Sequence, residues 1–326
     1  MKKKLVIFSG AGISAESGIP TFRDSDGLWE QHKVEDVATP EGWSRNRELV
    51  LEFYNERRRK LKEVSPNVGH TIIADMEKNY DVTVITQNID DLHERAGSTN
   101  VVHLHGQLLR SRSTMDPSLV FECLDDIKIG DKCPKGSQLR PDVVWFGEPV
   151  PMIEYAQSIV EEADILVVVG TSLAVWPAAG LPHLTKEDCQ IYYVDPKAEG
   201  LLSRDVFVLK QKASAGMKSV AKFLRAGGIP KPTFTVAAVL DLPGFGKYIA
   251  AIAEDFFQED RLEIKVGQNS TLGGVPLSGR FDTERYPTVI FHLKDPADAK
   301  KFKKGDLVHL EYNDVSLNKK ANGKHK

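Results

Sequence analysis

The chain has 326 residues, of which 41% are hydrophobic and 27% charged, and its formal net charge is -3. This composition is ordinary for a globular protein with one large and one smaller domain, and it argues against the disordered and fibrous classes. The small net charge gives no general attraction to nucleic acid, and no apolar stretch approaches the roughly 18 to 20 residues that span a bilayer.

Short apolar runs rich in β-branched residues have the length and character of strands buried on both faces. They are Leu5–Phe8, Val82–Thr86, Val101–Leu104, Ile165–Val169, Ile191–Val194 and Val206–Leu209. Helical patterns lie between several of them, at Arg47–Lys62, Gly69–Lys78, Ile153–Ala163 and Ala215–Leu224. The alternation predicts an α/β fold with a Rossmann-like, doubly wound parallel sheet. Residues 23–70 and 106–145 interrupt it and are expected to form a small inserted lobe.

The sheet domain is expected to end near Ala226, because glycine and proline are dense in residues 227–232 and mark a linker. Residues 233–317 alternate in β fashion around one helical stretch near Tyr248–Phe257, which predicts a small β-rich, α+β module. We assign this module no chemistry. Residues 318–326 are Lys-rich and are expected to form a flexible tail.

The first predicted strand leads directly into Gly10-Ala11-Gly12-Ile13-Ser14, followed by Gly18. Glycines at a strand-to-helix turn let backbone amides approach a pyrophosphate, helped by the helix N-terminus. The same pattern also occurs where a loop is merely tightened, so this turn does not decide the function alone.

Polar residues follow three further predicted strands: Gln87-Asn88-Ile89-Asp90, His105-Gly106 and Gly170-Thr171-Ser172. In doubly wound sheets, ligands bind at the carboxyl ends of the strands. Each cluster alone has an ordinary structural explanation, such as a core histidine at His105 or a helix cap at Asp90. Asp195, after the fifth predicted strand, serves either the cofactor or the turn at Pro196.

Taken together, these segments resemble the sirtuin family. The motifs appear in the family's order and approximate spacing, over residues 1 to about 225. They are Gly10–Ser14, Gly18–Arg23, Thr86–Asp90, His105–Gly106, Leu139–Pro141, Val144–Glu148 and Gly170–Ser172.

The resemblance implies an NAD-dependent protein-lysine deacylase. The amide oxygen of an acyl-lysine attacks the ribose carbon that carries nicotinamide, and nicotinamide leaves. His105 matches the family's general base, and an imidazole titrating near neutrality suits that role. Asn88 is the second predicted catalytic residue. The expected products are deacylated lysine, nicotinamide and 2'-O-acyl-ADP-ribose.

The resemblance also implies the binding residues, with NAD as co-substrate. Asp90 would accept from the nicotinamide carboxamide, and Phe22 and Arg23 would cover the reacting face. Val144–Glu148 has strand character and would pair with the substrate peptide, although Trp145 and Phe146 are equally explained as core residues. The predicted cofactor residues are Gly10, Ala11, Gly12, Ser14, Phe22, Arg23, Gln87, Asn88, Ile89, Asp90, Gly170, Thr171, Ser172, Asp195 and Ala213. The predicted substrate residues are Ala38, Tyr54, Arg57, Val144, Trp145, Phe146, Gly147 and Glu148.

The acyl preference is predicted from Tyr54 and Arg57, which are three residues apart and share a helix face. On generic grounds, Arg57 belongs to a solvated basic run that ends at Lys60. The Tyr-x-x-Arg pattern with the small Ala38 nevertheless resembles the sirtuin subgroup that removes succinyl and malonyl groups. An arginine fork and a phenol hydroxyl can hold a distal carboxylate. We therefore expect a desuccinylase or demalonylase with weaker deacetylase activity.

The family's structural zinc is not expected here, because its two Cys-x-x-Cys pairs are missing. Ser113 and Asp116 stand where the first pair would be, and Cys133 lacks a partner. Apolar packing through Leu119, Val120, Phe121 and Ile127 is expected to hold the segment instead. The three cysteines of the chain are also too few for a disulfide framework, which suggests a cytoplasmic protein.

Other functions remain open at this point. The same chemistry at the ribose could serve a mono-ADP-ribosyltransferase or an NAD hydrolase, and a non-catalytic NAD-sensing binding module is a third alternative. The expected partners are proteins with acylated lysines, with neither membrane nor nucleic acid indicated. The sequence leaves the oligomeric state open, and a monomer is the working expectation.

Overall fold

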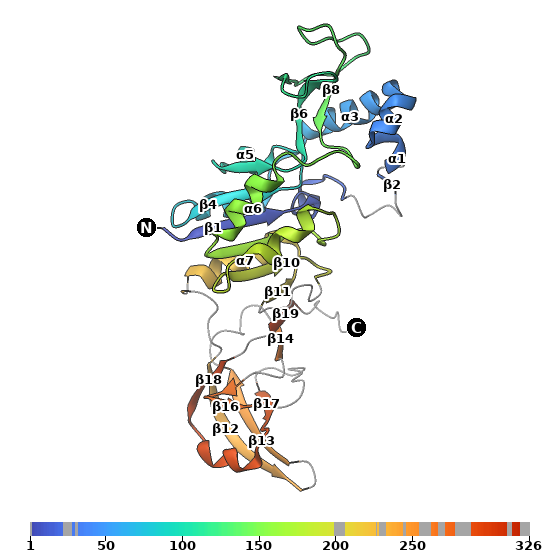
Figure 1. Cartoon of the computed structure of the whole chain (residues 1–326). Helices are drawn as coiled ribbons and strands as arrows, with labels where there is room; N and C mark the ends of the chain where they lie inside the picture. Colours follow the sequence, from blue (N-terminus) through green and yellow to red (C-terminus); the bar gives the residue numbers. More distant parts are fainter. Residues whose placement is uncertain are drawn as a thin grey trace. The chain divides into compact units, whose positions relative to one another are not determined.

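The computed structural model describes residues 2–21, 28–29, 32–198, 206–225, 227, 233–243, 246–253, 262–266, 271–277, 288–311 and 315–319. The chain divides into two compact units, which Figure 1 traces in sequence colours. Unit 1 comprises residues 1–190 and 212–218, and unit 2 comprises residues 191–211 and 219–326. Phe22 and Arg23 lie outside the described residues.

Unit 1 is built on parallel strands in the order β9-β1-β4-β5. Their bounds are Ile165–Val169, Lys4–Ser9, Asp81–Thr86 and Val101–His103. All of β9 and all but the first residue of β1 are buried, as expected for apolar strands covered on both faces. The parallel α/β sheet predicted from the apolar runs is confirmed.

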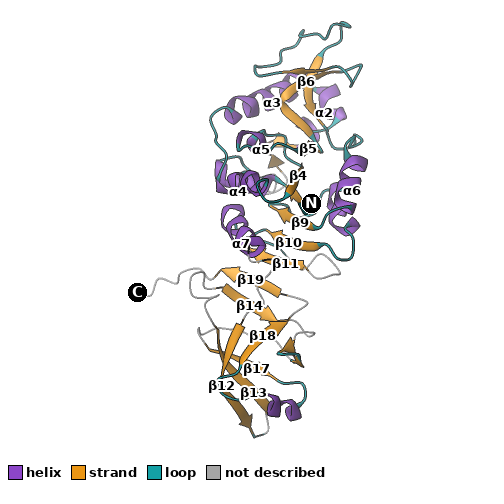
Figure 2. Ribbon diagram, turned by 90° about the vertical axis from the view of Figure 1, so that its left-hand side faces the viewer, coloured by secondary structure: helices purple, strands orange, loops and turns teal. Residues whose placement is uncertain are grey.

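Helices cover both faces of this sheet. Figure 2 shows α4 (Val68–Met76) and α5 (Leu92–Arg95) on one side and α6 (Ile153–Glu161) on the other. The N-terminus of α4 is fixed by a capping box, in which Asn67 accepts from Gly69 N at 2.8 Å and His70 Nδ1 accepts from Asn67 N at 3.3 Å. These layers leave the carboxyl ends of the strands for the loops that carry the predicted site.

The segments that interrupt the alternation form a lobe of helices and a three-stranded antiparallel sheet with the order β7-β6-β8. Ala38, Tyr54 and Trp145 share one buried apolar cluster in this lobe. The elements are β2 (Leu28–Trp29), β3 (His32–Lys33), α1 (Val34–Val37), α2 (Pro40–Arg45), α3 (Arg47–Leu61), β6 (Gly106–Ser113), β7 (Val120–Glu122) and β8 (Leu139–Val143).

Unit 2 contains two groups of strands. In the first, β11 (Val206–Lys210) lies parallel to both β10 (Gln190–Val194) and β19 (Val315–Lys319), and β14 (Leu262–Val266) is antiparallel to β19. Helix α7 (Ala213–Arg225) begins in unit 1 and ends in unit 2. Residues of the predicted C-terminal module therefore pair with a strand that was predicted for the sheet domain.

The second group is an antiparallel sheet with the order β16-β15-β18-β12-β13-β17. Its elements are β12 (Thr233–Leu242), β13 (Gly246–Ala253), β15 (Thr271–Leu272), β16 (Val275–Pro276), β17 (Thr288–His292) and β18 (Leu307–Glu311), and a short 3-10 helix, η4, covers Pro296–Lys301. The prediction of a helix near Tyr248–Phe257 is wrong for Tyr248–Ala253, the part that the structure describes, because β13 pairs with a strand on each side. Pairing on both edges outweighs the local helical preference of its alanines.

Candidate active site

The glycine segment after β1 does not start a regular helix. It forms two short 3-10 turns, Ala11–Ile13 and Ala15–Ser17, so the expected contribution of a helix N-terminus is wrong. The expected close backbone approach is present, because Gly12 N donates to Gly170 O at 2.8 Å. A Cβ on Gly12 would lie 2.7 Å from the Gly170 Cα atom. Only glycine at position 12 lets these two loops meet, which is the geometry a pyrophosphate cradle needs.

The glycine segment and the segment after β4 are joined through buried side chains. Asn88 Nδ2 donates to Gly10 O at 3.3 Å and to Ser14 Oγ at 3.2 Å. Ser14 Oγ in turn donates to Asp90 Oδ2 at 2.9 Å. Four of the predicted cofactor residues thus contact one another, although they come from two separate parts of the chain.

Asp90 serves two purposes. Its Oδ1 accepts from Leu92 N at 3.2 Å at the start of α5, which is the helix-capping role considered from the sequence. Burial raises the pKa of its carboxyl, opposed by hydrogen bonds from Leu92 and Ser14 and by the charge of His103. A buried carboxylate of this kind can bind a donor such as a carboxamide NH2 group.

Gln87 links the same segment to the loop after β9. Its Nε2 donates to Thr171 Oγ1 at 3.0 Å, and its backbone N donates to Ser9 O at 2.9 Å. Gly170 has a left-handed backbone with φ 64°, and the neighbouring Ser172 is half-buried. The carboxyl ends of β1, β4 and β9 therefore bring Gln87, Thr171 and the glycines together.

His105 follows β5 and is half-buried. Its Nδ1 lies 3.0 Å from Gln87 O. Because a carbonyl oxygen only accepts, Nδ1 carries a proton and Nε2 is left with a lone pair in the neutral ring. Burial lowers the pKa of His105 below its ordinary value of 6.5, so the neutral form dominates at physiological pH. This is the state that a general base requires.

Two other predicted cofactor residues, Asp195 and Ala213, lie in other parts of the chain. Asp195, in unit 2, accepts from Lys197 N at 2.8 Å, which is the turn-capping role that the sequence left open. Ala213 begins α7 and is buried, and the next residue, Ser214, donates from its N to Glu16 Oε2 at 2.8 Å. The start of α7 is thereby tied to the glycine segment.

Three contributors to the site were missed by sequence reasoning. Asn67 Nδ2 donates to Ile13 O at 2.7 Å and supports the glycine segment. His103 and Glu94 form a pair at 2.7 Å beside Asn88. The available signal was the position of His103 in the sequence, two residues before His105 and at the end of a predicted strand.

The predicted peptide-binding segment is a turn rather than a strand. Strand β8 ends at Val143, and the strand character expected for Val144–Glu148 is wrong. Glu148 holds the turn by accepting from Trp145 N at 2.9 Å and from Arg140 at 2.7 and 2.9 Å. The Arg140 guanidinium lies 3.4 Å from the centroid of the Trp145 ring. Because these contacts hold the segment as a turn, it presents no extended backbone with which a peptide could pair as a strand.

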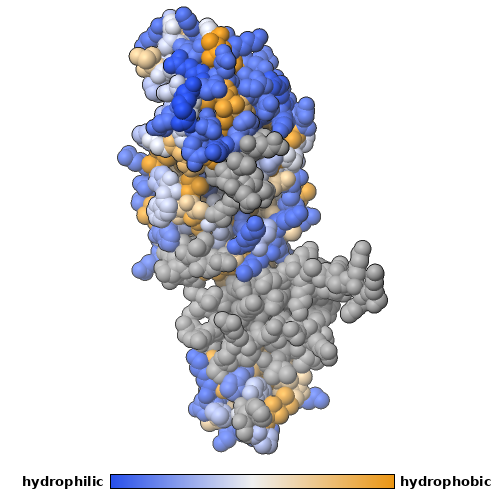
Figure 3. Space-filling model, turned by 90° about the vertical axis from the view of Figure 1, so that its right-hand side faces the viewer, coloured by the Kyte–Doolittle hydropathy of each residue, from blue (hydrophilic) through white to orange (hydrophobic). Residues whose placement is uncertain are grey.

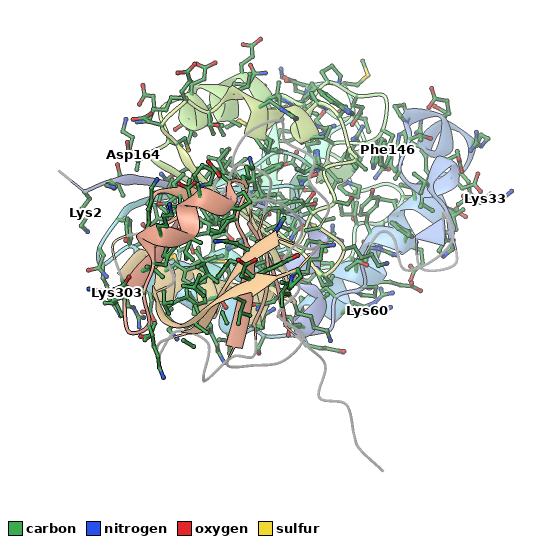
Figure 4. All side chains as sticks on the ribbon, turned by 90° about the horizontal axis from the view of Figure 1, so that it is seen from below. Lys2, Lys33, Lys60, Phe146, Asp164 and Lys303 are labelled. Atoms are coloured by element: carbon green, nitrogen blue, oxygen red, sulfur yellow. The ribbon has the colours of Figure 1, made fainter. Side chains whose placement is uncertain are left out.

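The same turn connects His105 with the lobe. Val144 N donates to His105 O at 2.9 Å, and Phe146 N donates to Ala38 O at 3.0 Å. Trp145 is 2% exposed and belongs to the core, whereas Phe146, labelled in Figure 4, is 44% exposed. The core explanation therefore holds for Trp145 and not for Phe146.

Helix α3 buries the predicted acyl-binding pair. Tyr54 is fully buried and Arg57 is only 8% exposed, so the explanation of Arg57 as part of a solvated basic face is wrong. Arg57 Nη1 donates to Phe53 O at 2.7 Å, and the guanidinium lies 3.2 Å from the Phe53 ring centroid. Arg58 is also buried, but it donates to Leu108 O and Asn55 Oδ1, which is a structural role.

Tyr54 is tied to the predicted peptide-binding turn. Trp145 Nε1 donates to Tyr54 Oη at 3.1 Å. Burial raises the pKa of Tyr54 well above its ordinary value, opposed in part by this hydrogen bond and by the positive charge of Arg57. The phenol therefore stays neutral and places no negative charge beside Arg57.

Ser113 and Cys133, considered from the sequence as positions of missing zinc ligands, belong to a hydrogen-bonded polar cluster. Ser113 Oγ lies 2.7 Å from Ser137 Oγ, and Cys133 Sγ lies 3.4 and 3.1 Å from these two oxygens. Hydrogen bonds with the two serines lower the pKa of Cys133 to about 7. Within the described ranges, no group of three or more His, Cys, Asp or Glu side chains could hold a metal.

The packing expected for this segment is only partly right. Ile127 is buried, but Leu119 and Phe121 are half-buried and Val120 is 38% exposed. Figure 3 shows patches of apolar atoms on the otherwise hydrophilic surface of the lobe at the top of the view. Among the helices that the structure describes, none is long and apolar enough to cross a membrane.

Comparisons with known proteins agree with this arrangement. The model of the Sir2 family matches residues 10–177. An NAD-dependent protein deacylase of Helicobacter pylori is 53% identical over 219 residues, which cover 67% of this chain and 96% of the relative. One of Bacteroides thetaiotaomicron is 52% identical over 237 residues, covering 71% of this chain and 100% of the relative.

Solved structures are similar as well. A Sir2 homolog in complex with NAD is 42% identical with a TM-score of 0.63, covering 69% of this chain and 91% of that one. A Sir2 protein in complex with a deacetylated p53 peptide and 3'-O-acetyl ADP-ribose is 27% identical with a TM-score of 0.57, covering 70% of this chain and 95% of that one. The matches leave almost a third of this chain uncovered.

Proposed function

The chain belongs to the Sir2 family of NAD-dependent protein deacylases, and we propose that it prefers lysines whose acyl group ends in a carboxylate, such as succinyl-lysine and malonyl-lysine. The observation that carries this proposal is the burial of Arg57 beside Tyr54 on one face of α3. Acetyl-lysine is the weaker substrate. We further propose that residues 1–226 form the deacylase domain.

The positions of Tyr54 and Arg57 relative to the reaction support this preference. Tyr54 contacts Trp145, and the neighbouring Val144 contacts the backbone of His105. An acyl-lysine that reaches His105 along this turn would direct the far end of its acyl group toward α3. A distal carboxylate would then lie near the guanidinium of Arg57.

Charge and hydrogen-bonding chemistry favour a carboxylate at that point. The arginine fork and the neutral phenol can both donate to carboxylate oxygens, and an acetyl group has no oxygen to offer them there. The attraction is strengthened because Arg57 is screened from water. A neutral acyl chain of equal length would fill the space without using the charge.

In the reaction we assign the following roles to the chain. Asn88 and Gln87 hold the ribose of NAD, Asp90 accepts from the carboxamide, and the segments at Gly12 and Gly170 receive the pyrophosphate. His105 accepts the ribose hydroxyl proton at Nε2, while its Nδ1 is held by Gln87 O. Once nicotinamide has left, the ribose oxygen can attack the acyl carbon; water then adds and the C–N bond to the lysine amine breaks, which gives free lysine and acyl-ADP-ribose. Acylated proteins are the proposed substrates.

The proposal is tested with one peptide carrying succinyl, malonyl, butyryl or acetyl on the same lysine. We expect kcat/KM to be highest for the two acidic groups. Butyryl controls for length, because it lacks the charge. Equal values for succinyl and butyryl would contradict the proposed role of the carboxylate.

A further inference from the structure

Two histidines, one at the end of β5 and one two residues after it, make parallel contacts with the segment after β4. His103 Nδ1 lies 3.0 Å from Asn88 O, and His105 Nδ1 lies 3.0 Å from Gln87 O. A carbonyl oxygen only accepts, so each Nδ1 carries a proton. The two imidazoles therefore hold successive carbonyls of the segment that we assign to NAD.

The second nitrogen of His103 faces a carboxylate, with Nε2 2.7 Å from Glu94 Oε1. Burial raises the pKa of Glu94, but the hydrogen bond and charge of His103, with help from Arg110, outweigh burial and leave the pKa below its ordinary value of 4.5. An ionised carboxylate accepts and cannot donate, so this contact calls for a donor at Nε2 as well. Both ring nitrogens of His103 thus face acceptors.

The His103 imidazole is almost fully enclosed, since its side chain is 5% exposed. The titratable and charged groups that face it or its partner are Asp90, His93, Glu94 and Arg110. Burial raises the pKa of Asp90, and the charge of His103 opposes that effect.

We propose that His103 is a positioning residue of the NAD site, which bridges Glu94 and the Asn88 carbonyl as an imidazolium and so fixes the segment from Asn88 to Asp90. The inference rests on the proposed assignment of Asn88 and Asp90 to NAD. His103 itself contacts neither substrate and acts through Asn88. It also supplies positive charge beside Asp90.

The protonation state is measured directly by NMR of the ring nitrogens in protein labelled with 15N-histidine, at neutral pH, with His103→Asn to identify the signals. We expect both nitrogens of His103 to carry protons in the native protein. In Glu94→Gln the new amide can donate to Nε2, so that nitrogen loses its proton. A singly protonated His103 in the native protein would overturn the proposal.

Kinetics test the positioning role. His103→Asn keeps a donor near the Nδ1 position but loses the charge and the bridge, whereas His103→Ala loses all three. We expect kcat/KM for NAD to fall about tenfold in His103→Ala, as for one lost charge-assisted hydrogen bond, and less in His103→Asn and Glu94→Gln. The KM for the acyl peptide should stay within about twofold, because Asn88 serves NAD rather than the peptide.

Two exposed substitutions provide matched controls, Glu122→Gln for the lost carboxylate and His183→Asn for the lost imidazole. Both should leave kcat/KM for NAD unchanged. If native protein is active and the His103 and Glu94 variants match these controls, the positioning role is wrong. If native protein shows no NAD-dependent deacylation, the proposed function itself fails, and this inference falls with it.

Discussion

Replacing Arg57 with methionine tests the acyl preference most sharply. Methionine keeps much of the length and apolar contact of the side chain, and it removes the guanidinium that lies 3.2 Å from the Phe53 ring centroid. Succinyl-lysine should lose the charge interaction, and acetyl-lysine has none to lose. The expected result is a fall in the ratio of kcat/KM for succinylated over acetylated peptide.

The size of this fall follows from the burial of Arg57, which is 8% exposed. Unit charges about 4 Å apart attract by about 4 kcal/mol at an effective dielectric constant near 20. Truncating one partner of a buried charged pair costs about 2 to 5 kcal/mol. Because about 1.4 kcal/mol corresponds to tenfold, the ratio should fall by at least about 30-fold.

Arg59 on the same helix provides the control. Its side chain is 47% exposed and pairs with Glu52 and Asp126, so Arg59→Met removes a surface arginine without touching Tyr54. Both variants are assayed on matched succinylated and acetylated peptides, with thermal melts to confirm folding. An unchanged ratio in Arg57→Met, or an equal change in Arg59→Met, would refute the reasoning.

Three further outcomes are expected. Because burial lowers the pKa of His105, kcat/KM should decrease with falling pH only below pH 6.5. A decrease that already begins above pH 6.5 would contradict the role of His105 as a buried general base. Burial lowers the pKa of His70 from 6.5 to about 4, so its contribution of about 3 kcal/mol to stability is present above pH 6.5 and lost toward pH 4. His70→Gln keeps a capping acceptor but cannot be protonated, so its free energy of unfolding in urea should decrease less toward pH 4 than that of the native protein. An unchanged pH dependence would exclude His70 as the source of the decrease. Elemental analysis of purified protein should find no zinc, because the Cys-x-x-Cys pairs are missing, and one zinc per chain would refute this expectation.

Much of the sheet could be predicted from sequence because buried parallel strands leave a local signal. The run Ile165–Val169 is apolar throughout, and all of β9 is buried. Residues 248–253 were misassigned to a helix for the opposite reason, since their strand conformation depends on pairing with β12 and β17, which local sequence does not reveal.

The site was only partly accessible from sequence. The residues that follow the strands could be expected to lie at one edge of the sheet, and Asn88, Ser14 and Asp90 do contact one another. The burial of Arg57 could not be derived from the basic run that contains it, because Arg57 and Arg59 differ only in the face of α3 that they occupy. Side-chain pairs across distant segments, such as His103 with Glu94, required the structure.

The products of one reaction test the central claim most directly. Native protein is mixed with NAD and a succinylated peptide, and all products are quantified by mass spectrometry. We predict free lysine peptide, nicotinamide and O-succinyl-ADP-ribose in equal amounts. Release of nicotinamide with ADP-ribose and an intact succinylated peptide, or with ADP-ribose attached to the peptide, would contradict the account.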